Sequence, residues 1–101
     1  LQSLIRNILA HLLKLEYSSA TAPRAGWVEE ITEFRAQAET KLDDTPSLKH
    51  YAEGLYQKAW PQARKINKKS FRVYQEKAKL PNHCPYTLDN VLDYDFFPKL
   101  N

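Results

Sequence analysis

The sequence is poor in the residues that build cross-linked, metal-bound or membrane-embedded folds. Its 101 residues include one cysteine, two glycines and no methionine. A single cysteine excludes a disulfide framework and a zinc site built on paired thiolates. No run of about 18 apolar residues can span a bilayer, and no secretory signal opens the chain. We therefore expect a cytoplasmic protein without a membrane span, metal or cofactor.

The chain has enough apolar residues to form a core. Hydrophobic residues make up 43% of it and aromatic residues 12%, which argues against intrinsic disorder. Its length suits one domain that buries roughly 60–65% of the surface of the unfolded chain. We expect a single domain over residues 1–101.

A helical pattern is present from the first residue. Six apolar residues share one arc at 100° per residue: Leu1, Leu4, Ile5, Ile8, Leu12 and Leu15. Ala10 falls on the opposite, polar side. No capping residue precedes Leu1, so we expect that an N-terminal segment is missing; a helix that frays at its start is the alternative.

A second helix is predicted from Trp27 to Leu42, after a loop that contains Pro23 and Gly26. The third helix is predicted from about Pro46 to Glu76, with Thr45 as its N-cap. Its apolar arc does not shift at Pro61, which projects to the polar side, so we predict one long helix kinked there. Two helices broken at Pro61 are the alternative. The arc consists of Leu48, Tyr51, Ala52, Leu55, Tyr56, Ala59, Ala63, Ile66, Val73 and Tyr74.

Prolines after Lys79 exclude another long helix. Thr87 caps a predicted short helix that ends at Leu92, and we expect Phe96 and Phe97 to dock on the other helices. No convincing strand alternation is visible. The predicted fold class is therefore all-α, a bundle of three principal helices and a short C-terminal helix.

Four short motifs carry a family resemblance. They are His11-Leu12-Leu13-Lys14 with Tyr17; Trp27 with Glu30-Ile31 and Arg35; Thr45-Pro46-Ser47-Leu48; and Cys84-Pro85-Tyr86-Thr87-Leu88 with Val91-Leu92-Asp93, Asp95-Phe96 and Pro98. In order and spacing, the chain resembles the bacterial family called domain of unknown function 29 over essentially its whole length. The resemblance implies an all-helical fold and no particular activity. It also implies a further acidic helical segment before the first helix, which agrees with the uncapped start.

One stretch of the predicted third helix concentrates positive charge. Residues 64–79 carry +6, whereas the whole chain carries +3 and the remainder therefore −3. Five of these cations point away from the apolar arc and form what we call the cationic ridge: Arg64, Lys65, Lys68, Lys69 and Arg72. Such a ridge can follow phosphates, and Phe71 on the same outer side can stack on a base. The alternative is an ordinary solvated helix face.

His11 and Arg35 are candidates for chemistry. His11 lies at the edge of the first apolar arc and can act as a general base, with Glu30 or Glu33 as its partner and Arg35 holding an anion. The alternative, which we favour, is structural: His11 is hydrogen-bonded across a helix interface, and Arg35 is paired with a carboxylate.

The sequence offers no convincing metal site, since His83 and Cys84 are adjacent and no second ligand pair follows. Cys84 is expected to be a small buried residue. Tyr17 and Trp60 lie off their helical stripes and are candidates for contact with the missing segment, a partner protein or a second copy.

These observations favour a helical protein-interaction module over an enzyme. The expected partner is another protein or a second copy of the chain. One alternative is a nucleic-acid-binding accessory protein that uses the cationic ridge. A third is a metal-assisted or metal-independent nuclease that uses His11 and acidic residues of the second helix.

Overall fold

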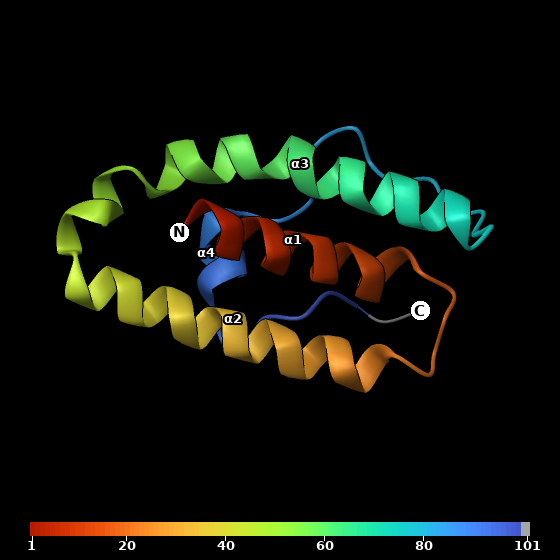
Figure 1. Ribbon diagram of the computed structural model, residues 1–101, viewed down its shortest axis with the longest axis horizontal. Helices are drawn as coiled ribbons and strands as arrows, with labels where there is room; N and C mark the ends of the chain where they lie inside the picture. Colours follow the sequence, from red (N-terminus) through yellow and green to blue (C-terminus); the bar gives the residue numbers. More distant parts are fainter. Residues whose placement is uncertain (100–101) are drawn as a thin grey trace.

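A computed structural model describes residues 1–99, and across these residues it contains helices and no strands. The elements are α1 (Gln2–Tyr17), α2 (Arg24–Asp44), the 3-10 helix η1 (Pro46–His50), α3 (Ala52–Val73) and α4 (Leu88–Leu92). Helices α1 and α3 run in the same direction, and α2 runs opposite to both (Figure 1). The predicted all-α class, with three long helices and one short one, is confirmed.

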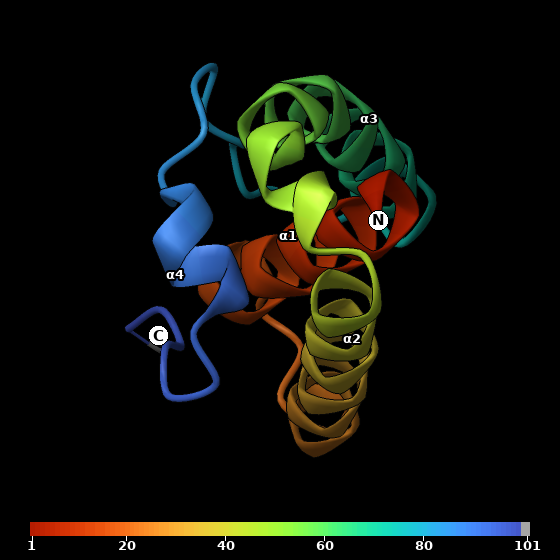
Figure 2. The ribbon, with the colours of Figure 1, turned by 90° about the vertical axis from the view of Figure 1, so that its left-hand side faces the viewer.

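Helix α1 is the central element of the bundle. It packs against α2 on one side and α3 on the other, and within residues 1–99 no Cα atom of α2 lies within 8 Å of one in α3. Figure 2 shows α1 between them, with α4 to one side. This central position explains why burial on α1 extends beyond one stripe. Ala10, predicted to face outward, is only 5% exposed, and Leu9 and Leu13 are fully buried.

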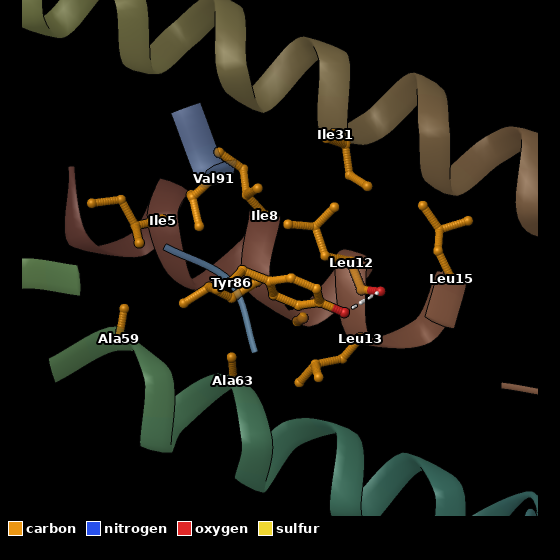
Figure 3. Close-up of a cluster of buried hydrophobic side chains, with 12 residues drawn as sticks. Ile5, Ile8, Leu12, Leu13, Leu15, Ile31, Ala59, Ala63, Tyr86 and Val91 are labelled. Atoms are coloured by element: carbon orange, nitrogen blue, oxygen red, sulfur yellow. Dashed lines mark hydrogen bonds between the residues drawn. The ribbon is translucent and has the colours of Figure 1, made fainter. Parts of the chain in front are cut away.

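The C-terminal segment closes one face of the three long helices. Val91 of α4 and Tyr86 lie against Ile5, Ile8 and Leu12 of α1, as Figure 3 shows. Phe96 and Phe97 pack against the same core, so the predicted docking of these two aromatic residues is confirmed.

Helix α2 begins earlier than predicted, at Arg24. Gly26 lies within its first turn, with backbone dihedrals that any residue can adopt, so it does not break the helix. Pro23 immediately precedes the helix, where a proline is tolerated because its missing N–H has no partner to lose.

The predicted third helix is correct in its main part and wrong at both ends. Pro46 opens η1, Thr45 makes no side-chain cap, and α3 itself begins at Ala52. Helix α3 continues through the exposed Pro61, so the alternative of two broken helices is wrong. It ends at Val73, three residues before the predicted Glu76.

The buried side of α3 departs from the predicted arc after Ala63. Asn67 and Phe71 are buried, whereas Ile66 is 44% exposed and Val73 65%. From Ala59 onward the buried residues are four apart, and each such step turns about 40° beyond one full turn. The contact line with α1 therefore drifts around α3, which a fixed arc does not anticipate.

Candidate functional site

The cationic ridge lies on the exposed side of α3 and divides into two rows. Residues four apart stand above one another on a helix. The inner row is Arg64, Lys68 and Arg72, and it faces the returning segment, residues 77–82. The outer row is Lys65 and Lys69, which flanks Ile66 and Val73.

Arg64 differs from the other four cations because the fold uses its guanidinium. Its Nε donates a hydrogen bond to the carbonyl oxygen of Pro81 at 2.8 Å, and Nη2 donates to Oδ1 of Asn82 at 3.3 Å. Arg64 thereby holds the returning segment against α3. The other four side chains of the ridge are exposed, and no carboxylate within residues 1–99 lies at ion-pair distance from them.

Two cavities lie between the inner row and the returning segment. One, of about 420 Å³, is lined by Arg64, Lys68, Arg72 and Lys79, with Glu76 as its one carboxylate. The other, of about 440 Å³, is lined by Trp60 and Lys65, and it shares Arg64, Lys68 and Asn82 with the first. We call the two together the α3 cleft. Its lining is strongly cationic and has an aromatic ring at one end.

Phe71 does not have the position predicted for it. Its side chain is 4% exposed, because the drift of the contact line turns it toward the core, and its ring cannot stack on a base. Trp60, which lines the α3 cleft and is half-buried, is the aromatic residue beside the ridge instead.

Glu76 is committed to the fold rather than to the cations around it. Its Oε1 accepts hydrogen bonds from Ser18 Oγ at 2.6 Å and from the Ser19 main-chain N–H at 2.9 Å. Partial burial alone would raise its pKa, but the hydrogen bonds from both serines outweigh burial, and the pKa of Glu76 is lowered. The carboxylate therefore ties the end of α3 to the loop after α1.

A different cavity opens where the C-terminal ends of α1 and α3 meet the start of α2. It has a volume of about 490 Å³ and is lined by Trp27, Phe71 and Tyr74 together with Lys14 and Ser70. The Lys14 ammonium lies 5.8 Å from the centre of the Trp27 ring, a cation–π contact.

Three exposed apolar residues lie at this end of α3, which we call the apolar strip: Ile66, Val73 and Tyr74. Ile66 and Val73 are two turns apart and share one side of the helix. Tyr74 is 76% exposed and lines the cavity of Trp27. The strip was predicted to be buried, and no feature of its spacing distinguishes it from core.

His11 joins α1 to α2. Its Nδ1 lies 2.9 Å from the carbonyl oxygen of Asn7, its Nε2 is paired with Glu30, and its ring packs edge-on against Phe34. The side chain is 14% exposed, and it lines none of the cavities described above. This is the environment of a packing residue that is hydrogen-bonded across a helix interface.

Arg35 is buried and holds α4. Its Nε donates to the carbonyl oxygen of Val91 at 2.8 Å and Nη2 donates to that of Asn90 at 3.1 Å, while the guanidinium lies over the Phe97 ring. We expected a carboxylate partner, but the direct partners are main-chain carbonyls at the C-terminal end of a helix, where a cation is favoured. Burial lowers the pKa of Arg35, and the nearby Asp93 partly opposes this.

The Cys84–Tyr86 motif is a hydrogen-bonded contact with α1 and α3 rather than a metal site. The Tyr86 hydroxyl lies 2.8 Å from Glu16 Oε1. It also lies 3.1 Å from the Leu12 carbonyl oxygen (Figure 3). The Tyr86 carbonyl accepts hydrogen bonds from Tyr56 and from Cys84 Sγ. Burial raises the pKa of the Cys84 thiol, which is unfavourable for a nucleophilic thiolate. Neither Tyr56 nor Tyr86 was predicted to have this role, since their hydrogen bonds join segments far apart in sequence.

The described residues lack two other kinds of site. No three His, Cys, Asp or Glu side chains among them are grouped closely enough to hold a metal ion. None of the helices in this part of the chain has both the length and the apolar character to cross a membrane. Tyr17 and Trp60, the other interaction candidates, are half-buried and pack against the core.

The architecture is that of an all-α protein with a central helix and a cationic, partly apolar outer helix. The chain belongs to the family described as "Domain of unknown function DUF29", whose model matches residues 1–97. The family resemblance carried by the four motifs is thereby confirmed. Neither the curated proteins nor the solved structures contain a match to the chain.

Proposed function

We propose that this protein is a helical interaction module that binds an amphipathic, acidic helix of another protein on α3. The observation that carries the proposal is the apolar strip of Ile66, Val73 and Tyr74. Single exposed apolar side chains are normal on protein surfaces. Three of them within nine residues, beside a cavity of about 490 Å³ lined by Trp27, are typical of a binding surface.

The surroundings of the strip indicate the chemistry of its partner. Lys65 and Lys69 flank Ile66 and Val73 on one side and have no carboxylate partner among the described residues. A partner helix with an apolar stripe and acidic residues beside it would complement both features. An aromatic or aliphatic anchor on that helix would enter the cavity between Trp27 and Tyr74.

The test is site-directed photo-crosslinking of the full chain in its native host. A photo-crosslinking amino acid replaces Val73, and the matched control replaces Tyr51, which is equally exposed but lies outside the strip. A protein captured from position 73 and not from 51 is then mapped, and a peptide of the mapped segment is titrated against the chain and against Ile66→Ser/Val73→Ser. We expect an acidic amphipathic peptide whose affinity falls at least tenfold in the double variant.

Two results would overturn this proposal. One is a captured segment that is neither helical nor acidic, or whose affinity is unchanged in the double variant. The other is capture of a second copy of the chain, with a dimer that the double variant dissociates in light scattering, which would replace the partner protein by self-association.

A second candidate function, nucleic-acid binding, is favoured by a separate observation: the exposed cations of the ridge lack ion-pair partners within residues 1–99. Electrophoretic mobility with RNA and DNA at two salt concentrations tests it. We expect binding that weakens steeply with salt and is lost in Lys65→Glu/Lys68→Glu/Lys69→Glu. Absence of a shift at low salt would eliminate this candidate. The nuclease alternative has no comparable support, because His11 faces α2 and not a cavity.

A further inference from the structure

We infer that the α3 cleft is a binding site for single-stranded nucleic acid, with phosphates on Lys65, Lys68, Arg72 and Lys79 and one base stacked on Trp60. The inference rests on the second candidate function and gives it a location, a strand type and a division of roles within the ridge. It separates the cations that contact the ligand from those that only add to the charge of the surface.

The cleft carries positive charge of the kind that a polyanion requires. Its two cavities share Arg64, Lys68 and Asn82, so they lie next to each other along a side of α3. Lys68 and Arg72 are one turn apart, which separates them by roughly 6 Å along the helix axis. Lys79 faces them from the returning segment. Successive phosphates can therefore meet successive cations.

The cleft has one negative charge against five positive ones. Glu76 is the one carboxylate that lines either cavity, and its Oε1 is occupied by hydrogen bonds from Ser18 and Ser19. Arg64 is likewise occupied, since it holds Pro81 and Asn82. The role of Arg64 is therefore to build the wall of the cleft, and the four other cations that line it are available to phosphates: Lys65, Lys68, Arg72 and Lys79.

The returning segment decides between a single strand and a duplex. A helix that reads duplex DNA enters the major groove with one side uncovered. The inner row of α3 is instead lined on its other side by residues 78–82, which would keep that row out of a groove. A single strand can lie in the cleft, and its unpaired bases can stack on an aromatic ring.

Trp60 is placed for such stacking. It lines the end of the cleft next to Lys65 and Lys68, and its ring is half-buried against the core. A ring fixed in this way loses little conformational entropy when a base stacks on it. Stacking on a tryptophan also makes binding tolerant of sequence, because every base offers a flat face.

The test is fluorescence anisotropy with the full chain and four labelled probes: oligothymidylate, oligouridylate, a DNA duplex of equal length and inorganic polyphosphate. Lys68→Glu/Arg72→Glu reverses the charge of the two cations of the inner row that are not bound by the fold. Its matched control, Lys58→Glu/Lys69→Glu, makes the same change of charge on the same helix, at two exposed lysines that line neither cavity. Trp60→Leu tests stacking, Trp60→Tyr tests rescue, and circular dichroism checks that each variant remains folded.

We expect both single strands to bind at least tenfold more tightly than the duplex. The inner-row variant should lose at least tenfold more affinity than the control variant, and its salt dependence should fall by about two phosphate contacts. Trp60→Leu should weaken the single strands by roughly five- to a hundredfold and leave polyphosphate unchanged, while Trp60→Tyr should retain most of the affinity.

The failures are distinguishable. One outcome is that nucleic acid binds while the two double variants lose affinity equally, and another is that the duplex binds as well as the single strand. Either result would show that the α3 cleft is not the binding site, and it would leave the second candidate function, nucleic-acid binding, standing. If Trp60→Leu affects no probe, stacking is wrong and phosphate contact alone remains. If no nucleic acid binds at low salt, both the second candidate function and the inference are wrong.

Discussion

Asn67 of α3 donates a hydrogen bond from Nδ2 to the carbonyl oxygen of Ala10 in α1, 2.9 Å away in the fully buried interface of the two helices. Nδ2 also lies 3.4 Å from the carbonyl oxygen of Ala63, one turn earlier in its own helix. Oδ1 has no hydrogen-bond partner within residues 1–99. This amide therefore fixes the position of α3 along α1 at the point where the contact line turns away from Ile66.

Replacing Asn67 by aspartate should destabilise the fold strongly at neutral pH. The substitution puts a carboxylate against the Ala10 carbonyl oxygen in a buried interface, at a cost of about 3 kcal/mol or more. A protonated carboxyl can donate to that carbonyl, so the folded state would raise the pKa of the new group. The loss should then be smallest below about pH 4 and grow as the pH rises.

Urea unfolding of Asn67→Asp at pH 4 and pH 7 measures this dependence. Asn67→Ala serves as the control, because it removes the hydrogen bond without adding a titratable group. It should cost about 1–2 kcal/mol relative to the parent chain at both pH values. An Asn67→Asp variant whose deficit does not change with pH would show that the site is open to water.

Gln75 has a left-handed backbone conformation, with a φ of 57°, two residues after the last residue of α3. The Glu76 N–H donates to the carbonyl of Phe71 and the Gln75 N–H to that of Arg72, the hydrogen-bond pair of a Schellman motif. Glycine has no Cβ to strain in this conformation. Gln75→Gly should therefore raise the free energy of unfolding by about 0.5–1 kcal/mol.

Thermal and urea unfolding of the Gln75 series measure the effect. Gln75→Val is the informative counterpart, because a β-branched residue is poorly tolerated at positive φ and should lower stability. Equal stability of the glycine and valine variants would argue against a left-handed residue at this position in solution.

The parts of the fold that were predictable are those that depend on neighbouring residues in the sequence. Helical spacing gave the three long helices, Thr87 caps α4 through a capping box with Asn90 as its sequence position indicates, and the unshifted phase around Pro61 indicated one helix. The predictions that failed concern which residues of α3 are buried, and this depends on how the helices cross. Neither the burial of Phe71 nor the exposure of Val73 follows from the periodicity of α3, because both depend on the path of α1 beneath it.

The candidate sites divide in the same way. The cationic ridge is visible in the sequence because charge at four-residue spacing defines a helix face. The same spacing gives its two rows, but it does not show which row faces the returning segment, since that segment comes back to α3 through the hydrogen bonds of Arg64 with residues 81 and 82. Such contacts between distant segments produce no periodic pattern in the amino-acid sequence.

Arg35 should be essential for the attachment of α4. Arg35→Met keeps much of the side-chain volume but removes the guanidinium that donates to the carbonyls of Asn90 and Val91, and the Asn90 carbonyl keeps only the Asp93 N–H as a donor. We expect a loss of about 2–3 kcal/mol in the free energy of unfolding, as for hydrogen bonds from a charged group. Arg35→Lys should recover only part of it, because an ammonium lacks the guanidinium fork.

Hydrogen exchange locates this effect. Amides of α4 should exchange faster in Arg35→Met. The exchange rates of amides in the middle of α1 should change only as much as the global stability changes. Uniformly faster exchange in all helices would mean that Arg35 supports the whole core and not α4 in particular.

Glu76 should make the stability of the protein sensitive to acid. Its pKa is lowered in the folded state: partial burial alone would raise it, but the hydrogen bonds from Ser18 and Ser19 prevail. A carboxyl with a depressed folded pKa contributes stability that is present above its unfolded pKa and lost as the pH falls through the folded value.

Urea unfolding between pH 6 and pH 3 measures this effect. The free energy of unfolding of the parent chain should fall over this range, and the fall should be smaller in Glu76→Gln. Glu29→Gln, an exposed substitution on α2, controls for the general change of charge. Identical pH profiles for Glu76→Gln and the parent would mean that the serines do not hold the carboxylate in solution, and the Glu76 carboxylate would then be free to pair with the cations of the α3 cleft.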